Sequence, residues 1–558
     1  MRDVTPGRFE VSPWTVLERE LDHDRLAEAE SIFALANGHI GLRGNLEEGE
    51  PHGIPGTYLN GYFESVALPY AEGGYGYPSE GQTLIDVTNG KLLRLLVDDE
   101  PLDVRLGTTG RHERELDLRE GVLRRDVNWT SPAGQTVEVR TTRLVSFAQR
   151  SVAAIEYEVE AIGAPARITL QSTLVANEPV AGQTDDPRSG AALRAPLAGE
   201  YHAHHDMQAS LGHRTKRSGL RMSAGMDHVV EGPDGTTIGS ESDPHLARVT
   251  ISTELQAGET LRVVKFLAYG WSSVRSTPAL RDQVDAALAA ARRTGWDGLV
   301  QAQKDYLAAF WAVGDVEVDG DPELQQAVRF SLFQVLQSAA RAEQRAIPAK
   351  GLTGRGYDGH TFWDSETYTL PVLSYLAPKA AADAIRWRHS TLPLAMTRAR
   401  ELRLVGAAFP WRTIRGEECS GYWPAGTASF HVNADVAEAV RRYVAATGDA
   451  ELERTIGMEL LVETARLWRH LGHHDPEGCF RIDGVTGPDE YSALVDNNVF
   501  TNLMAAKNLE AAADVAERYP DRAAELDVDP DEITSWREAA GAMTVPFDGE
   551  LGVTSQSE

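Results

Sequence analysis

The sequence predicts a β-sandwich followed by linker helices and a helical toroid, and three observations support this fold. Short runs in the first half alternate apolar and polar residues between turn sequences, which is typical of half-buried strands. Ala-rich segments with helical spacing come next, and glycine-rich loops separate further helix-like segments in the second half. We place the sandwich at residues 1–270, the helical linker at 271–318 and the toroid at 319–558.

The strands of the predicted sandwich are recognised by their alternation and by the turns beside them. Residues 136–144 alternate apolar and polar side chains and follow the turn Ser131-Pro132-Ala133-Gly134. Many short strands with such punctuation favour a sandwich. The other strand-like runs are residues 152–159, 166–175, 249–255 and 261–268.

The helices are predicted from apolar residues at helical spacing. Residues 278–293 and 299–313 form the linker. Asp321-Pro322 and Asp529-Pro530 place a capping residue and a proline at two helix starts. The predicted helices after the linker are residues 323–345, 366–375, 378–401, 433–447, 452–471, 501–518 and 531–543.

Charge and composition limit the classes of protein to which this chain can belong. The net charge of −29 over 558 residues argues against a nucleic-acid binder, which needs a basic surface. Two cysteines, Cys419 and Cys479, are too few for a disulfide framework. No run is long and apolar enough for a membrane span, and residues 1–6 open no signal-like segment. We expect a cytoplasmic protein.

Two motifs combine carboxylates with aromatic or amide side chains in glycine-rich turns. The first is residues 359–366 (GHTFWDSE), and the second is residues 484–491 (GVTGPDEY), followed by Asp496-Asn497-Asn498. An aromatic face can cover a pyranose, a carboxylate can accept bonds from its hydroxyls, and a positioned glutamate can protonate a glycosidic oxygen. The motifs therefore predict a carbohydrate-active enzyme.

The chain resembles glycoside hydrolase family 65, the inverting α-glucoside phosphorylases that act on maltose, trehalose, kojibiose or nigerose. The matching segments are residues 36–45 (ANGHIGLRGN), Phe362-Trp363-Asp364, residues 406–411 (GAAFPW), residues 431–435 (HVNAD) and residues 486–491 (TGPDEY). The resemblance implies an N-terminal β-sandwich, linker helices, an (α/α)6 catalytic barrel, a small C-terminal β-domain and a homodimer.

The resemblance also implies that part of the family's chain is missing here. A closed (α/α)6 barrel needs twelve helices, and we predict about seven after residue 321. The family's Lys-Gln pair for the sugar and its Ser-rich loop for phosphate have no counterpart in these 558 residues. We therefore expect an incomplete barrel, typical of a truncated chain.

The resemblance implies that Glu490 is the general acid. Inversion needs one acid on the leaving-group side and a nucleophile on the opposite face of the sugar. Burial or the neighbouring Asp489 should raise the pKa of this acid. Asp489 as the acid is the alternative within the motif, and the simpler interpretation is that both carboxylates cap a helix start.

Trp363 and Asp364 match the family's binding pair for the transferred glucose. The simpler interpretation of this pair is a core tryptophan with a capping aspartate. His360 and Glu366 are weaker candidates for the same sugar site, because a histidine beside a helix start is often only a hydrogen-bond partner.

Trp411, Arg412 and Glu418 lie in the loop that shapes the acceptor subsite in the family. The loop continues as Cys419-Ser420-Gly421-Tyr422-Trp423-Pro424 and lacks the continuation of maltose-acting members, which favours trehalose or kojibiose. A structural loop with a surface ion pair is the alternative.

Three functions remain open from the sequence. The first is phosphorolysis of an α-linked glucose disaccharide to β-glucose 1-phosphate and glucose, with inorganic phosphate as co-substrate and no cofactor. The second is hydrolysis with inversion on the same scaffold, and the third is a sugar-binding protein without catalysis. We expect no metal site and no nucleic-acid or membrane partner.

Overall fold

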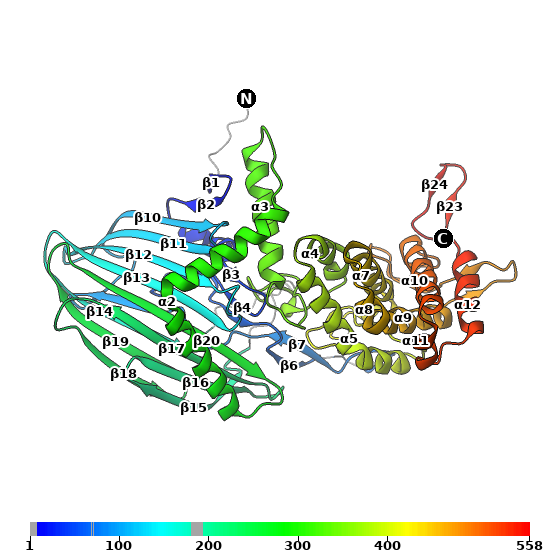
Figure 1. Ribbon diagram of the computed structural model, residues 1–558, viewed down its shortest axis with the longest axis horizontal. Coiled ribbons are helices and arrows are strands. Elements are labelled where there is room, and N and C mark those ends of the chain that lie inside the picture. The colour runs from blue at the N-terminus through cyan, green and yellow to red at the C-terminus, as the bar shows by residue number, and fades with distance from the viewer. Residues whose placement is uncertain (1–7, 69, 71, 180–192) are drawn as a thin grey trace. The chain divides into compact units, whose positions relative to one another are not determined.

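The computed structural model describes residues 8–68, 70, 72–179 and 193–558 (Figure 1). Its contacts divide the chain into two compact units. The first unit consists of Met1–Glu64, Leu84–Arg341 and Lys350–Asp358, and the second of Ser65–Thr83, Ala342–Ala349 and Gly359–Glu558. A β-rich part followed by a helical part is confirmed, whereas domain boundaries at residues 270 and 318 stay a prediction. The segment that bears on a signal peptide, residues 1–6, lies outside the described residues.

Two large antiparallel sheets make up most of the first unit. Among the described residues, the larger sheet has the order β1 (Glu10–Val11), β2 (Thr15–Glu18), β10 (Thr108–Asp117), β11 (Val122–Thr130), β12 (Thr136–Val145), β13 (Val152–Ile162), β20 (Thr260–Ser272), β17 (Arg221–Glu231), β16 (Gln208–Thr215) and β15 (Leu197–His205). The smaller has the order β18 (Thr237–Asp243), β19 (Leu246–Leu255), β14 (Ala166–Val175), β8 (Leu93–Val97) and β9 (Glu100–Pro101). All five predicted strands are present, and β14 has the predicted bounds.

Hydrogen bonds between the two sheets show that they lie face to face. His228 Nε2 of β17 is 2.7 Å from Ser172 Oγ of β14. Lys265 Nζ of β20 donates to the carbonyl of Thr173, also in β14, at 3.1 Å. Burial lowers the pKa of Lys265 well below its usual value. The predicted sandwich is therefore present, with polar groups bridging its two layers.

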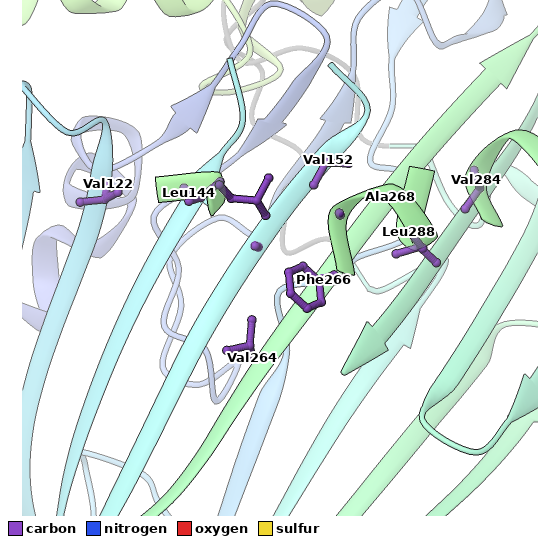
Figure 2. Packing of buried hydrophobic residues seen from close by; sticks show 11 residues of the cluster. Val122, Leu144, Val152, Val264, Phe266, Ala268, Val284 and Leu288 are labelled. Carbon is purple, nitrogen blue, oxygen red and sulfur yellow. The ribbon is translucent and has the colours of Figure 1, made fainter. Parts of the chain in front are cut away.

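One long helix, α2 (Thr277–Gly314), packs on the other face of the larger sheet against β17 and β20 (Figure 1). Gly295 has a φ of 72° and interrupts it, so both predicted linker helices are present as parts of one element. Figure 2 shows the apolar side chains at this contact, which come from β11, β12, β13, β20 and α2. They are Val122, Leu144, Val152, Ala154, Val264, Phe266, Ala268, Val284, Leu288, Ala291 and Leu299.

The remaining helices agree closely with the predicted segments. Asp321 accepts a hydrogen bond from the Leu324 amide at 2.9 Å, and Asp529 from the Glu532 amide at 2.8 Å, so both predicted caps are confirmed. Helix α3 (Pro322–Ala339) falls in the first unit. The second unit contains α4 (Leu370–Leu376), α5 (Pro378–Glu401), α6 (Trp423–Ala428), α7 (His431–Thr447), α8 (Ala450–Leu452), α9 (Met458–Leu471), α10 (Val499–Arg518), α11 (Pro520–Glu525) and α12 (Pro530–Gly541).

Helix α7 is the centre of the second unit, because it packs against α4, α5, α9 and α10. The first motif directly precedes α4, and the second directly precedes α10. Both motifs are therefore carried by helices that contact α7. Within the described residues, no helix is both long and apolar enough to cross a bilayer.

Candidate functional site

Four aromatic rings from separate segments meet in the second unit. The His431 ring, in the first turn of α7, lies 5.1 Å from Trp363, 5.5 Å from Trp411 and 5.7 Å from Phe500 between ring centroids. Trp363 also contacts Phe500, in the first turn of α10, at 5.9 Å. The start of α7, the start of α10 and the two loops that carry Trp363 and Trp411 therefore converge on one cluster.

The first motif divides its side chains between the surface and the interior. Trp363 is half-buried and Asp364 is exposed, so an indole and a carboxylate remain accessible next to each other. Glu366 is buried, and its carboxylate accepts two bonds from Arg388 of α5, at 2.5 Å and 3.0 Å. The motif ends in a π-helical turn, Ser365–Thr369, a distortion found often at functional sites.

His360 is buried and held on both ring nitrogens. Arg412 Nε donates to His360 Nδ1, so the other nitrogen, Nε2, carries the proton that is donated to the Gln82 carbonyl. Burial, followed by the neighbouring Arg412 guanidinium, lowers the pKa of His360 well below its usual value. His360 is thus a neutral link between Gln82 and Arg412.

The loop that carries Trp411 is organised by the buried carboxylate of Glu418. Glu418 accepts the backbone amides of Trp411 at 2.6 Å, Cys419 at 2.9 Å and Ser420 at 2.8 Å. Burial raises the pKa of Glu418, although these amide donors oppose the shift. Burial, followed by the neighbouring Glu418 carboxylate, raises the pKa of Cys419, which disfavours the thiolate form of this side chain.

The second motif is anchored at its ends and exposed in its middle. The Thr486 amide donates to the Ala428 carbonyl at 3.0 Å, and Asn498 caps α10 by accepting the Thr501 amide at 3.1 Å. Asp489 and Glu490 are exposed, so burial of the acid, the first of the two alternatives that we expected to act on it, is absent in this structure. Gln556 donates to the Asp489 carboxylate at 3.0 Å.

Sequence reasoning missed four residues that organise the site. Gln82 accepts the Ile414 amide at 2.9 Å and the Arg415 amide at 3.0 Å, yet it precedes that loop by more than 300 residues and no local pattern marks it. Arg388 of α5 holds Glu366. His431 and Asp435 pair at 2.9 Å; the available signal was their spacing of four within the matching segment 431–435, although the predicted helix began only at residue 433.

The described residues contain no group of three or more His, Cys, Asp or Glu side chains that could hold a metal ion. An exposed glutamate on a loop that leads into an aromatic cluster can supply a proton to a sugar bound there.

Comparison with family models identifies both parts of the chain. Residues 16–310 match the model of the glycosyl hydrolase family 65 N-terminal domain. Residues 329–558 match the central catalytic domain of the same family.

Individual relatives agree with these matches. An uncharacterized glycosyl hydrolase of Mycobacterium tuberculosis is 59% identical over 100% of this chain and 71% of its own length. An alpha,alpha-trehalose phosphorylase of Thermoanaerobacter brockii is 36% identical over 98% of this chain and 72% of its own length. A solved structure, a putative kojibiose phosphorylase from the human microbiome, shares the fold with a TM-score of 0.90 and 24% identity, over 99% of this chain and 72% of that one.

Proposed function

Because the chain belongs to glycosyl hydrolase family 65, we propose that it cleaves an α-glucosidic disaccharide by phosphorolysis with inversion. Phosphate attacks C1 of the transferred glucose from the face opposite the leaving group, the C1–O bond breaks, and Glu490 gives its proton to the departing oxygen. The products are β-glucose 1-phosphate and glucose. Inorganic phosphate is already an anion, so this reaction needs no second catalytic carboxylate, no cofactor and no metal.

One observation carries the assignment of Glu490. Its exposed carboxylate lies on a loop that ends at the cap residue Asn498, and two residues later the Phe500 ring contacts Trp363. The loop that carries the proton donor Glu490 thus runs directly into the helix whose Phe500 ring contacts Trp363, the ring that stacks on the sugar. Asp364, exposed beside Trp363, supplies the hydrogen-bond acceptor for the hydroxyls of the transferred glucose.

The remaining candidates act at the edges of the same site. We place His360 and Arg412 on one side of the acceptor subsite, since their hydrogen bond joins the two loops. Trp411 forms an aromatic wall, and Glu418 holds its loop in shape through three amide bonds. Glu366 orders the first motif through Arg388 rather than offering a free carboxylate.

Trehalose is the substrate we propose first. The loop after Arg412 lacks the sequence expected of maltose-acting members, and a relative that is 36% identical is named a trehalose phosphorylase. Kojibiose is the second choice. We further propose that the protein acts in the cytoplasm as a homodimer.

The test is proton and phosphorus NMR of the protein with trehalose, kojibiose, nigerose or maltose, each with and without phosphate. Formation of β-glucose 1-phosphate, dependent on phosphate, is the expected result, and the reacting sugar identifies the substrate. Release of glucose without phosphate would replace the proposal by hydrolysis with inversion. Binding of a disaccharide without any product would leave a sugar-binding protein and would contradict the proposal for this chain.

A further inference from the structure

A buried pair on α7 contacts the site without belonging to either motif. His431 and Asp435 are both buried, and His431 Nδ1 lies 2.9 Å from the Asp435 carboxylate. They are one helical turn apart, so their side chains lie on the same face of α7.

His431 contacts both tryptophans of the site. Its ring is inclined by 89° to the Trp363 ring and by 81° to the Trp411 ring, the edge-to-face geometry that aromatic pairs favour. Trp363 and Trp411 come from loops 48 residues apart, and neither loop is a regular helix or strand at these positions. The β-bridge between Thr361 and Thr413 joins the two loops, and the imidazole is a common contact for the two rings that these loops carry.

A carboxylate that accepts the Nδ1 proton of a histidine fixes the tautomer and the orientation of the ring. His431 Nε2 and Asp435 Oδ1 make no hydrogen bond within the described part of the chain, although both atoms are buried. The bond between the two residues is therefore the polar contact that this structure shows for orienting the imidazole. Burial raises the pKa of Asp435, and its bond to His431 opposes the shift.

We propose that His431 and Asp435 are a positioning pair: Asp435 orients the His431 ring, and this ring holds Trp363 and Trp411 as two walls of the sugar subsite. The identity of the bound sugar rests on the proposed function, whereas the orientation of the two indoles does not. Neither residue takes part in the chemical step. The pair sets the distance between the walls and hence the affinity for the sugar.

The first part of the test observes the two indoles directly. The whole chain is labelled with 5-fluorotryptophan, and the fluorine signals of Trp363 and Trp411 are assigned with Trp363→Phe and Trp411→Phe variants. Asp435→Ala is expected to move both signals, because releasing the imidazole changes its contacts with both rings. Asp435→Asn, which keeps an oxygen that can accept the Nδ1 proton, is expected to leave both signals near their original positions.

The matched control is Glu459→Ala. Glu459 of α9 pairs with His389 of α5 at 2.6 Å, a partly exposed histidine–carboxylate contact in the same unit, and it also accepts a bond from Arg522. The control is expected to leave the Trp363 and Trp411 signals unmoved. The proposal is overturned if Asp435→Ala moves neither signal, or moves them no more than the control does.

The second part measures glucose affinity by calorimetry. Asp435→Ala and His431→Phe are expected to weaken binding about tenfold, whereas Asp435→Asn stays within about twofold of the parent chain. If Asp435→Ala does not fold, the other two variants test the proposal. Asp435→Asn must then keep an affinity for glucose near that of the parent chain, and His431→Phe must lose affinity clearly. Any other result for these two variants overturns the proposal. A parent chain that binds no sugar contradicts the proposed function, and the fluorine signals still test the positioning pair.

Discussion

The two motifs look alike in sequence but are built differently in the structure. In the first, Glu366 is buried in a two-bond ion pair with Arg388, and His360 is held on both ring nitrogens. In the second, Asp489 and Glu490 are exposed, and only the ends of the loop are tied to the helices. In the first motif, Glu366 and His360 are paired with residues from other segments and only Asp364 is exposed, whereas both neighbouring carboxylates of the second motif are exposed.

This difference separates residues that shape a site from residues that act in it. A buried, fully paired carboxylate cannot exchange a proton with a substrate without first losing its partners. An accessible carboxylate on an anchored loop can do so. The predictions below test this division, beginning with the largest expected effect.

Glu490→Gln should lower kcat about 10²- to 10⁴-fold, the usual contribution of a general acid, while the sugar Kd stays almost unchanged. Release of product from trehalose in the presence of phosphate gives kcat, and calorimetry gives Kd. Asp489→Asn is the matched control and should keep most of the activity. The reverse result for these two variants would make Asp489 the acid.

Glu366→Ala should lower the free energy of unfolding by about 3–5 kcal/mol, because it leaves Arg388 buried without its partner. Urea denaturation measures the change. The control is Glu451→Ala, which removes a solvent-exposed ion pair with Arg454 and should cost at most about 1 kcal/mol. Equal losses in the two variants would show that the first motif is not held together by this buried pair.

Gly487→Ala should destabilise the protein by about 1–2 kcal/mol, because the new Cβ would lie 2.3 Å from Asn498 Nδ2. The amide would have to move and would release its cap on α10. Thermal melting of this variant is compared with that of Gly541→Ala, where a Cβ meets nothing within 4 Å. If Gly487→Ala were as stable as the parent chain, the Asn498 side chain could move without a loss of stability, which would contradict the prediction.

The smallest effect concerns the pH dependence of stability at Glu418. Burial raises its pKa above the ordinary value of 4.5, so the folded state binds this proton more tightly than the unfolded state. The contribution of protonated Glu418 to the free energy of unfolding is fully present below the pKa of the unfolded state. It is lost as the pH rises through the higher pKa of the folded state. The advantage of the parent chain over Glu418→Gln should therefore narrow from pH 4 to pH 7 in urea denaturation. If the difference in the free energy of unfolding between the two chains grew from pH 4 to pH 7, the pKa of Glu418 would be lowered by folding and not raised.

Local patterns in the sequence predict most of the helices after residue 277, but only five of the strands in the two large sheets. Helix α5 and strand β14 have the predicted bounds, and the capping residues Asp321 and Asp529 act as expected. Strand alternation, helical spacing and capping depend on residues that are close together in the chain, so these patterns can be recognised in the sequence alone. The resemblance to family 65 rests on similarly short motifs, and the family matches confirm it.

The partners of the site residues were not predictable in this way. Gln82 reaches the loop at Ile414, and Arg388 reaches Glu366, through contacts that exist only after the chain has folded. The exposed position of Glu490 was not expected either, because burial depends on which helices pack over a loop. Sequence spacing says nothing about such neighbours unless they lie on the same helix face.

By itself, the sequence determined the family, most of the helices and five of the strands, and it predicted two loops in which to look for the chemistry. The tertiary structure decided which carboxylates are buried and hydrogen-bonded within the protein, as Glu366 and Glu418 are. It also decided which carboxylates stay exposed, as Asp364 and Glu490 do. The physical reason is that secondary structure depends on short-range backbone and side-chain preferences. The state of a charged group depends on desolvation and on partners that distant segments bring to it.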